Sequence, residues 1–116
     1  MSRKDRVESL LKNEIAKIVQ TKLTNNEKIG FISITRVELN SDLSLAKVFY
    51  SQIGNEQAKQ DTIKALMKTT KFVKYEIGKN LRLKRIPNIR FLFDENLEKS
   101  FEVINTLNRL NEEQNN

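Results

Sequence analysis

The chain has 116 residues, enough for a single domain whose core needs no disulfide or metal to hold it together. It contains no cysteine and no histidine, which excludes a Cys/His zinc site and catalysis by a thiol or an imidazole. The net charge of +6 indicates a polyanionic partner, either a nucleic acid or an anionic membrane surface. The N-terminal segment has no signal-peptide pattern, and the chain has no apolar run of membrane-spanning length, so we expect a cytoplasmic protein.

Residues 3–22 predict an amphipathic helix, because their apolar residues recur at intervals of three and four. Ser2 is the expected N-cap and Asp5 suits the first turn. The turn-forming residues of segment 25–30 should end this helix.

Segments 31–39 and 46–50 alternate in polarity, and the first is rich in β-branched residues, so they predict two strands joined as an antiparallel hairpin. Between them, Asp42 is expected to hydrogen-bond within its own turn; the alternative is a carboxylate pair with Glu38 for acid–base chemistry or magnesium. The alternation of the first strand is imperfect, because apolar residues occur on both faces: Ile32 and Ile34 with Arg36 on one, Val37 and Leu39 on the other.

Residues 56–83 predict a long helical region with one apolar stripe, formed by Ile63, Leu66, Met67, Val73, Ile77 and Leu81. In an unbroken helix Phe72 would point almost opposite Ile63, and two successive threonines favour a helix only weakly. One continuous helix is possible, but we expect a kink that turns Phe72 inward and divides the region into two helices. The kink residues would be Thr69, Thr70 and Lys71.

The same region carries the positive charge of the chain. Residues 59–90 hold ten basic and two acidic residues, so their net charge of +8 exceeds that of the whole chain. At about 100° per residue, five cations fall in an arc about 80° wide that includes Tyr75: Lys64, Lys68, Lys71, Lys79 and Arg82. Such a face could follow a phosphate backbone and stack on an unpaired base; the alternative is a solvated lysine-rich helix face, which is common.

After this region, Gly78 marks a close contact or the approach to the helix end, and Pro87 excludes further helix. Residues 88–94 predict a third strand, and Asp94 is expected to be an N-cap rather than a metal ligand. A last amphipathic helix would carry Leu97, Phe101, Ile104, Leu107 and Leu110 and cover apolar surface that the other helices leave open.

The predicted order is helix, strand, strand, helix, helix, strand, helix, which defines an α+β domain over residues 3–110 with a polar, disordered tail at 111–116. Because the first strand is the more apolar, we place it at the centre of a mixed three-stranded sheet, antiparallel to the second strand and parallel to the third.

An ordered set of residues along this pattern carries a resemblance to a known family. They are Arg6-Val7, Ile34-Thr35-Arg36-Val37-Glu38, Asp42-Leu43, Ala46-Lys47-Val48, Ala65-Leu66, Phe72-Val73-Lys74, Gly78-Lys79, Leu81-Arg82-Leu83-Lys84, Pro87, Phe91 and Asp94. With these residues, from residue 3 to about 110, the chain resembles the bacterial ribosome-binding factor A family.

The resemblance implies a type II K-homology (KH) fold in which a helix–kink–helix with a small-x-Gly pattern replaces the usual Gly-x-x-Gly loop. This sequence departs from the pattern, because it has Thr69-Thr70-Lys71 there; a left-handed backbone at Lys71 would cost about 1 kcal/mol. The resemblance further implies binding to the free small (30S) ribosomal subunit and its 16S rRNA, with roles in rRNA 5′-end processing and adaptation to cold.

We therefore predict a monomeric, non-enzymatic assembly factor that needs no cofactor or metal. Its predicted phosphate contacts are Lys64, Lys68, Lys71, Lys74, Lys79, Arg82, Lys84 and Arg85. The alternative is a protein-interaction module that uses the last helix or the free edge of the second strand. A membrane-surface role fits less well, because the basic face lacks an exposed apolar set to anchor it.

Overall fold

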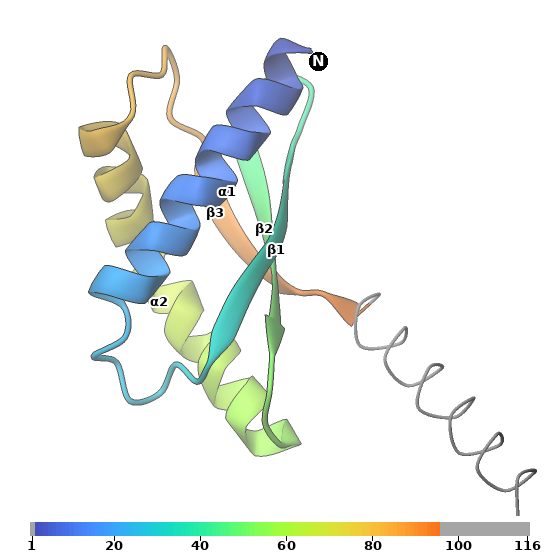
Figure 1. Cartoon of the computed structure of the whole chain (residues 1–116), viewed down its shortest axis with the longest axis vertical. Helices are drawn as coiled ribbons and strands as arrows, with labels where there is room; N and C mark the ends of the chain where they lie inside the picture. The colour runs from blue at the N-terminus through green and yellow to red at the C-terminus, as the bar shows by residue number, and fades with distance from the viewer. Residues whose placement is uncertain (1, 96–116) are drawn as a thin grey trace, which may run out of the picture.

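The computed structural model describes residues 2–95, so the predicted last helix and the tail at 111–116 lie outside the described residues. Two helices and three strands follow one another in the order α, β, β, α, β (Figure 1). They are α1 (Arg3–Lys22), β1 (Ile32–Leu39), β2 (Leu45–Gln52), α2 (Glu56–Asn80) and β3 (Asn88–Phe93).

The first helix begins as the sequence predicts. The Ser2 hydroxyl accepts a hydrogen bond from the Asp5 amide at 3.1 Å, and the Asp5 carboxylate accepts one from the Ser2 amide at 3.3 Å. This reciprocal capping box satisfies amides that have no partner within the helix. The apolar stripe of α1 is buried, at Leu11, Ile15, Ile18 and Val19.

A β-bulge in β1 changes which of its residues face the core. Ile34 pairs with Tyr50 and Arg36 with Phe49, so Thr35 is an extra residue that inverts the alternation. As a result, four apolar residues share the core face: Ile32, Ile34, Val37 and Leu39. The prediction that divided them between two faces is therefore wrong, and so is the placement of Arg36 beside Ile34.

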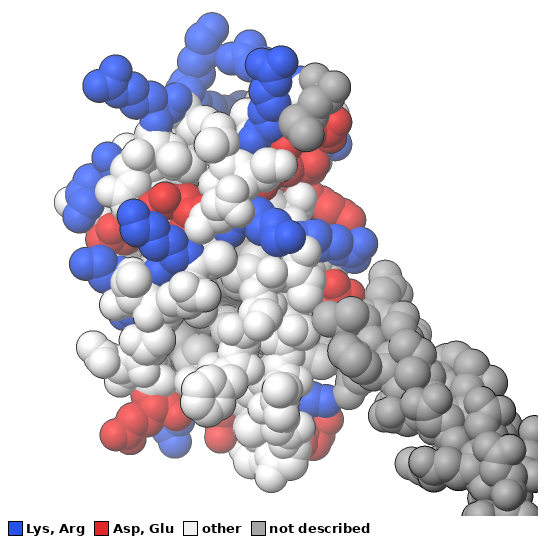
Figure 2. All heavy atoms as spheres, in the orientation of Figure 1, with Lys and Arg blue, Asp and Glu red and all other residues white. Residues whose placement is uncertain are grey.

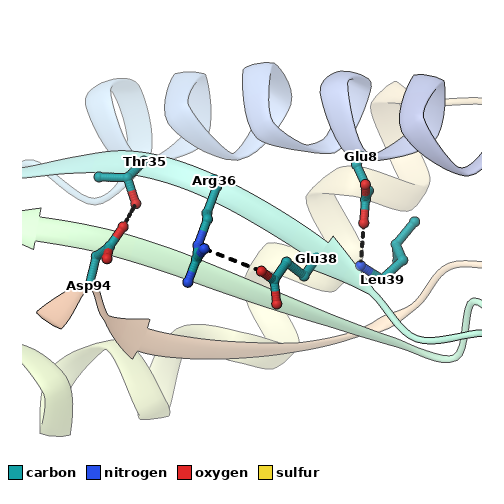
Figure 3. A network of polar contacts seen from close by, with 6 residues as sticks. All are labelled: Glu8, Thr35, Arg36, Glu38, Leu39 and Asp94. Carbon is teal, nitrogen blue, oxygen red and sulfur yellow. Dashed lines mark hydrogen bonds and ion pairs between the residues drawn. The ribbon is translucent and has the colours of Figure 1, made fainter. Parts of the chain in front are cut away.

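The order of the strands also differs from the prediction. β2 is central, antiparallel to β1 and parallel to β3, so the expected central position of the first strand is wrong. The inward residues of β2 are the most deeply buried of the sheet: Ala46, Val48 and Tyr50. As an edge strand, β1 is protected by α1, because the Glu8 carboxylate accepts a hydrogen bond from the Leu39 amide at 2.7 Å (Figure 3).

The second helix is continuous, which corrects the expected division into two helices. No residue of α2 has a left-handed backbone, so the strain considered for Lys71 does not arise. The hydroxyls of Thr69 and Thr70 donate to the carbonyls of Leu66 and Met67, three residues earlier, and are thus satisfied within the helix. Phe72 is not turned inward: 41% of it is exposed.

Both helices cover the same face of the sheet. The buried residues of α1 and α2 form one cluster with the inward residues of all three strands, and α1 packs against β1 while α2 packs against β3. Figure 1 shows α1 beside β1, and the long α2 crosses behind α1. The opposite face of the sheet carries both polar and apolar residues, and on it the Arg36 guanidinium lies 4.0 Å from the centre of the Phe49 ring. Because α2 packs on the sheet with one side only, its other side faces solvent.

Candidate nucleic-acid interface

The solvent side of α2 carries four exposed lysines, which we call the lysine face: Lys64, Lys68, Lys71 and Lys79. They lie opposite the buried residues Leu66, Val73 and Ile77, as the helical periodicity requires. Figure 2 shows that Lys and Arg side chains gather at the end of the molecule where α2 leads into the connection to β3, while the opposite end has few.

The C-terminal half of the lysine face borders a shallow groove of about 550 Å³, which we call the Tyr75 groove. Its lining residues are Lys71, Lys74, Tyr75, Gly78, Lys79 and Ile86. The Lys74 ammonium donates to the Asn88 side-chain oxygen at 2.9 Å, so β3 holds this lysine at the wall of the groove. The Lys79 ammonium lies 3.6 Å from the buried Glu76 carboxylate and 5.9 Å from the centre of the Tyr75 ring.

The N-terminal half borders a second groove of about 370 Å³, lined by Asn26, Lys28, Asp61, Lys64, Ala65 and Lys68. Lys28 adds a cation that no sequence pattern indicated, because it lies in a loop where neither helical nor strand periodicity predicts the direction of a side chain. The buried Thr62 hydroxyl fixes this loop on α2: it accepts from the Gly30 amide at 3.1 Å and donates to the Lys28 carbonyl at 3.4 Å.

The three remaining predicted contacts, Arg82, Lys84 and Arg85, are exposed in the connection between α2 and β3. This connection lies against the hairpin turn, because the Asn88 amide donates to the Ser44 carbonyl at 2.8 Å. The pKa of Asp42, in this turn, is lowered mainly by hydrogen bonds from the Ser44 hydroxyl and amide. The positive charge of Arg85 in the connection lowers it to a smaller extent. The predicted phosphate contacts thus occupy one side of α2 and the loop that continues it.

The acidic residues singled out in the sequence have structural partners. The Asp42 carboxylate accepts from the Ser44 hydroxyl at 2.6 Å and from the Ser44 amide at 3.1 Å, which confirms the predicted turn. The Asp94 carboxylate accepts from the Thr35 hydroxyl at 2.6 Å and so ties the bulge of β1 to the end of β3 (Figure 3). Whether Asp94 also caps the last helix concerns residues outside those described.

Within residues 2–95, no group of three or more acidic side chains could hold a metal ion. No helix in the same range is long and apolar enough to cross a membrane. Both edges of β2 are paired, which removes the second-strand edge that the alternative hypothesis proposed as a docking site. The exposed side chains of α2 include the ammonium groups of the lysine face and the aromatic rings of Phe72 and Tyr75.

The fold and this surface define a small KH-like α+β domain with a basic side on its long helix. Residues 3–107 match the family model for ribosome-binding factor A, and the chain belongs to this family. It is 44% identical to ribosome-binding factor A from Staphylococcus epidermidis over 96 residues, which are 83% of this chain and 82% of that protein.

Two structural comparisons extend this result. A Thermotoga maritima protein of the same description, solved by NMR, is 31% identical with a TM-score of 0.64, covering 78% of this chain and 85% of that chain. A homology model of Thermus thermophilus ribosome-binding factor A, fitted into a cryo-EM map of a complex with the 30S subunit, is 21% identical. Its TM-score is 0.62, with coverage of 74% of this chain and 89% of that chain, so it supports the fold.

Proposed function

We propose that this protein binds the free 30S subunit through 16S rRNA and acts as a non-enzymatic assembly factor. Family membership supports this proposal, as does the homology model of the Thermus relative, which was fitted into the map of a complex with the 30S subunit. The protein would act in the cytoplasm as a monomer, support maturation of the rRNA 5′ end and contribute to growth in the cold.

The observation that carries the proposal is the lysine face. Four ammonium groups on one rigid helix cannot neutralise one another, whereas a phosphate backbone lying along α2 can contact several of them and release its counterions. The loop residues Arg82, Lys84 and Arg85 would extend this contact beyond the helix. Three to five phosphate contacts predict a log–log salt slope of about −2 to −4.

Such a protein would act by occupying a binding site on the immature rRNA. A protein bound along α2 covers a segment of immature rRNA and thereby controls which contacts that segment makes, with no bond made or broken. The sheet and α1 support α2 from behind through one buried core, so the spacing of the ammonium groups is maintained.

The test is reversal of two adjacent charges, Lys68→Glu with Lys71→Glu. We expect binding to free 30S subunits, measured by co-sedimentation over a salt series, to fall at least about tenfold, with a salt slope shallower by about 1.5. The fold should survive, because both side chains are exposed.

The matched control makes the same change in net charge on α1, with Lys4→Glu and Lys12→Glu, which are also exposed. It should bind nearly as well as the wild type. Equal binding by both double variants would contradict the assignment of the lysine face. Binding that hardly responds to salt would point instead to a protein-interaction module.

A further inference from the structure

Tyr75 is an exposed aromatic residue within the lysine face. Its exposed fraction is 65%, whereas the other tyrosine of the chain, Tyr50, is buried in the core at 1%. On the helix, Lys71 lies one turn before Tyr75 and Lys79 one turn after it, about 12 Å apart along the axis. The ring is therefore flanked by positive charge on both sides.

The Tyr75 groove offers space beside this ring. Gly78 contributes no side chain, and a Cβ atom placed there would lie 3.5 Å from Ile86 Cγ1, so Gly78 and the Ile86 side chain lie close together and form an apolar part of the groove lining. The groove volume of about 550 Å³ is within the range of small-ligand sites, roughly 300 to 1,000 Å³.

Among residues 2–95, the aromatic face of Tyr75 has only a weak partner. The Lys79 ammonium, at 5.9 Å from the ring centre, is at the outer limit of a cation–π contact, and it also lies 3.6 Å from Glu76. A planar ligand that stacks on the ring would therefore displace little. The ammonium groups of Lys71 and Lys79 would suit the anionic groups attached to such a ligand.

We propose that the Tyr75 groove binds one unpaired nucleotide, with its base stacked on the Tyr75 ring and its flanking phosphates on Lys71 and Lys79. This inference rests on the proposed function and names single-stranded rRNA as the element recognised. Duplex RNA does not fit, because its bases remain stacked within the helix and cannot reach a side chain on the protein surface. A splayed single-stranded base can do so.

The first test separates base stacking from charge, using the full chain with Tyr75→Leu and Tyr75→Phe. The probes are a short oligouridylate and inorganic polyphosphate, which carries charge but no base. We expect Tyr75→Leu to weaken oligouridylate binding about tenfold and Tyr75→Phe to retain it. Polyphosphate should bind all three proteins equally, with the same salt slope.

The second test uses the absence of tryptophan from the sequence. Tyr75→Trp creates a single fluorophore in the groove, and Phe72→Trp creates one on the same helix outside the residues that line it. Oligouridylate should quench the fluorescence of the first variant and leave that of the second unchanged. Polyphosphate should quench neither.

The possible failures are distinguishable. If Tyr75→Leu binds oligouridylate like the wild type while the Lys68/Lys71 reversal does not, the nucleotide site is refuted and the proposed function stands. The same holds if the wild type binds 30S subunits but not oligouridylate. If Tyr75→Leu loses affinity for oligouridylate and for polyphosphate to the same extent, base stacking is also refuted. If the wild type fails to bind 30S subunits at every salt concentration, both proposals are refuted.

Discussion

Single side chains in this protein are held by burial or by short polar contacts that the fold provides. Tyr50 is the largest fully buried side chain among residues 2–95, and its ring packs edge-on against Phe91 and Phe93 of β3, with centroids 6.5 and 5.8 Å away. Burial disfavours the phenolate and raises the pKa of Tyr50 to about 12. Its protonation is therefore coupled to folding.

The coupling predicts a loss of stability in alkali. In the unfolded chain a tyrosine has a pKa of about 10, so the stabilising effect is complete below pH 10 and is lost as the pH rises towards 12. Relative to Tyr50→Phe, the wild type should lose up to about 3 kcal/mol of unfolding free energy over this interval. Urea unfolding of both proteins at several pH values measures the difference. Parallel curves would show that Tyr50 does not titrate with unfolding.

At the scale of elements, polar contacts join segments that hydrophobic patterns alone would leave unspecified. The Glu8 carboxylate of α1 satisfies the Leu39 amide at the edge of β1, and the Thr62 hydroxyl of α2 accepts from both the Gly30 amide and the Gln52 side chain, at 3.1 and 2.8 Å. The bulge at Thr35 is tied to Asp94 in the same way. These contacts set where each element begins or bends.

The link between α1 and β1 can be tested with Glu8→Ala. The change removes a charged acceptor from a partly buried amide and should cost about 1.5 to 3 kcal/mol of unfolding free energy. Hydrogen exchange at the Leu39 amide should accelerate. Glu8→Gln keeps an acceptor oxygen and should lose less; similar losses in the two variants would mean that charge, not the hydrogen bond, stabilises the contact.

On the scale of the whole molecule, one hydrophobic core joins both helices and all three strands. Two neighbouring apolar residues of α2, Leu66 and Met67, therefore differ sharply in their contribution to the stability of the fold. Leu66 is completely buried in this core, whereas 66% of Met67 is exposed. The sequence pattern assigned both to the buried stripe, and the assignment of Met67 is wrong because α2 meets the sheet with only part of that arc.

Leu66→Ala and Met67→Ala form a matched pair for this point. We expect Leu66→Ala to cost about 2 to 5 kcal/mol because it leaves a cavity, and Met67→Ala to change stability by no more than about 0.5 kcal/mol. Chemical denaturation followed by circular dichroism measures both. A large effect of Met67→Ala would indicate that its side chain is covered in solution.

Local patterns in the sequence were sufficient to predict α1 and its cap, the hairpin, the position of β3 and the exposed side of α2, because each depends on neighbouring residues and on helical or strand periodicity. The tertiary structure decided the rest. The central position of β2 depends on pairing between distant strands, the core face of β1 on a single bulged residue, and the continuity of α2 on packing along its whole length. Likewise, only the fold brings Lys28 beside Lys64 and Ile86 against Gly78, since such contacts depend on how distant segments pack and leave no local periodicity.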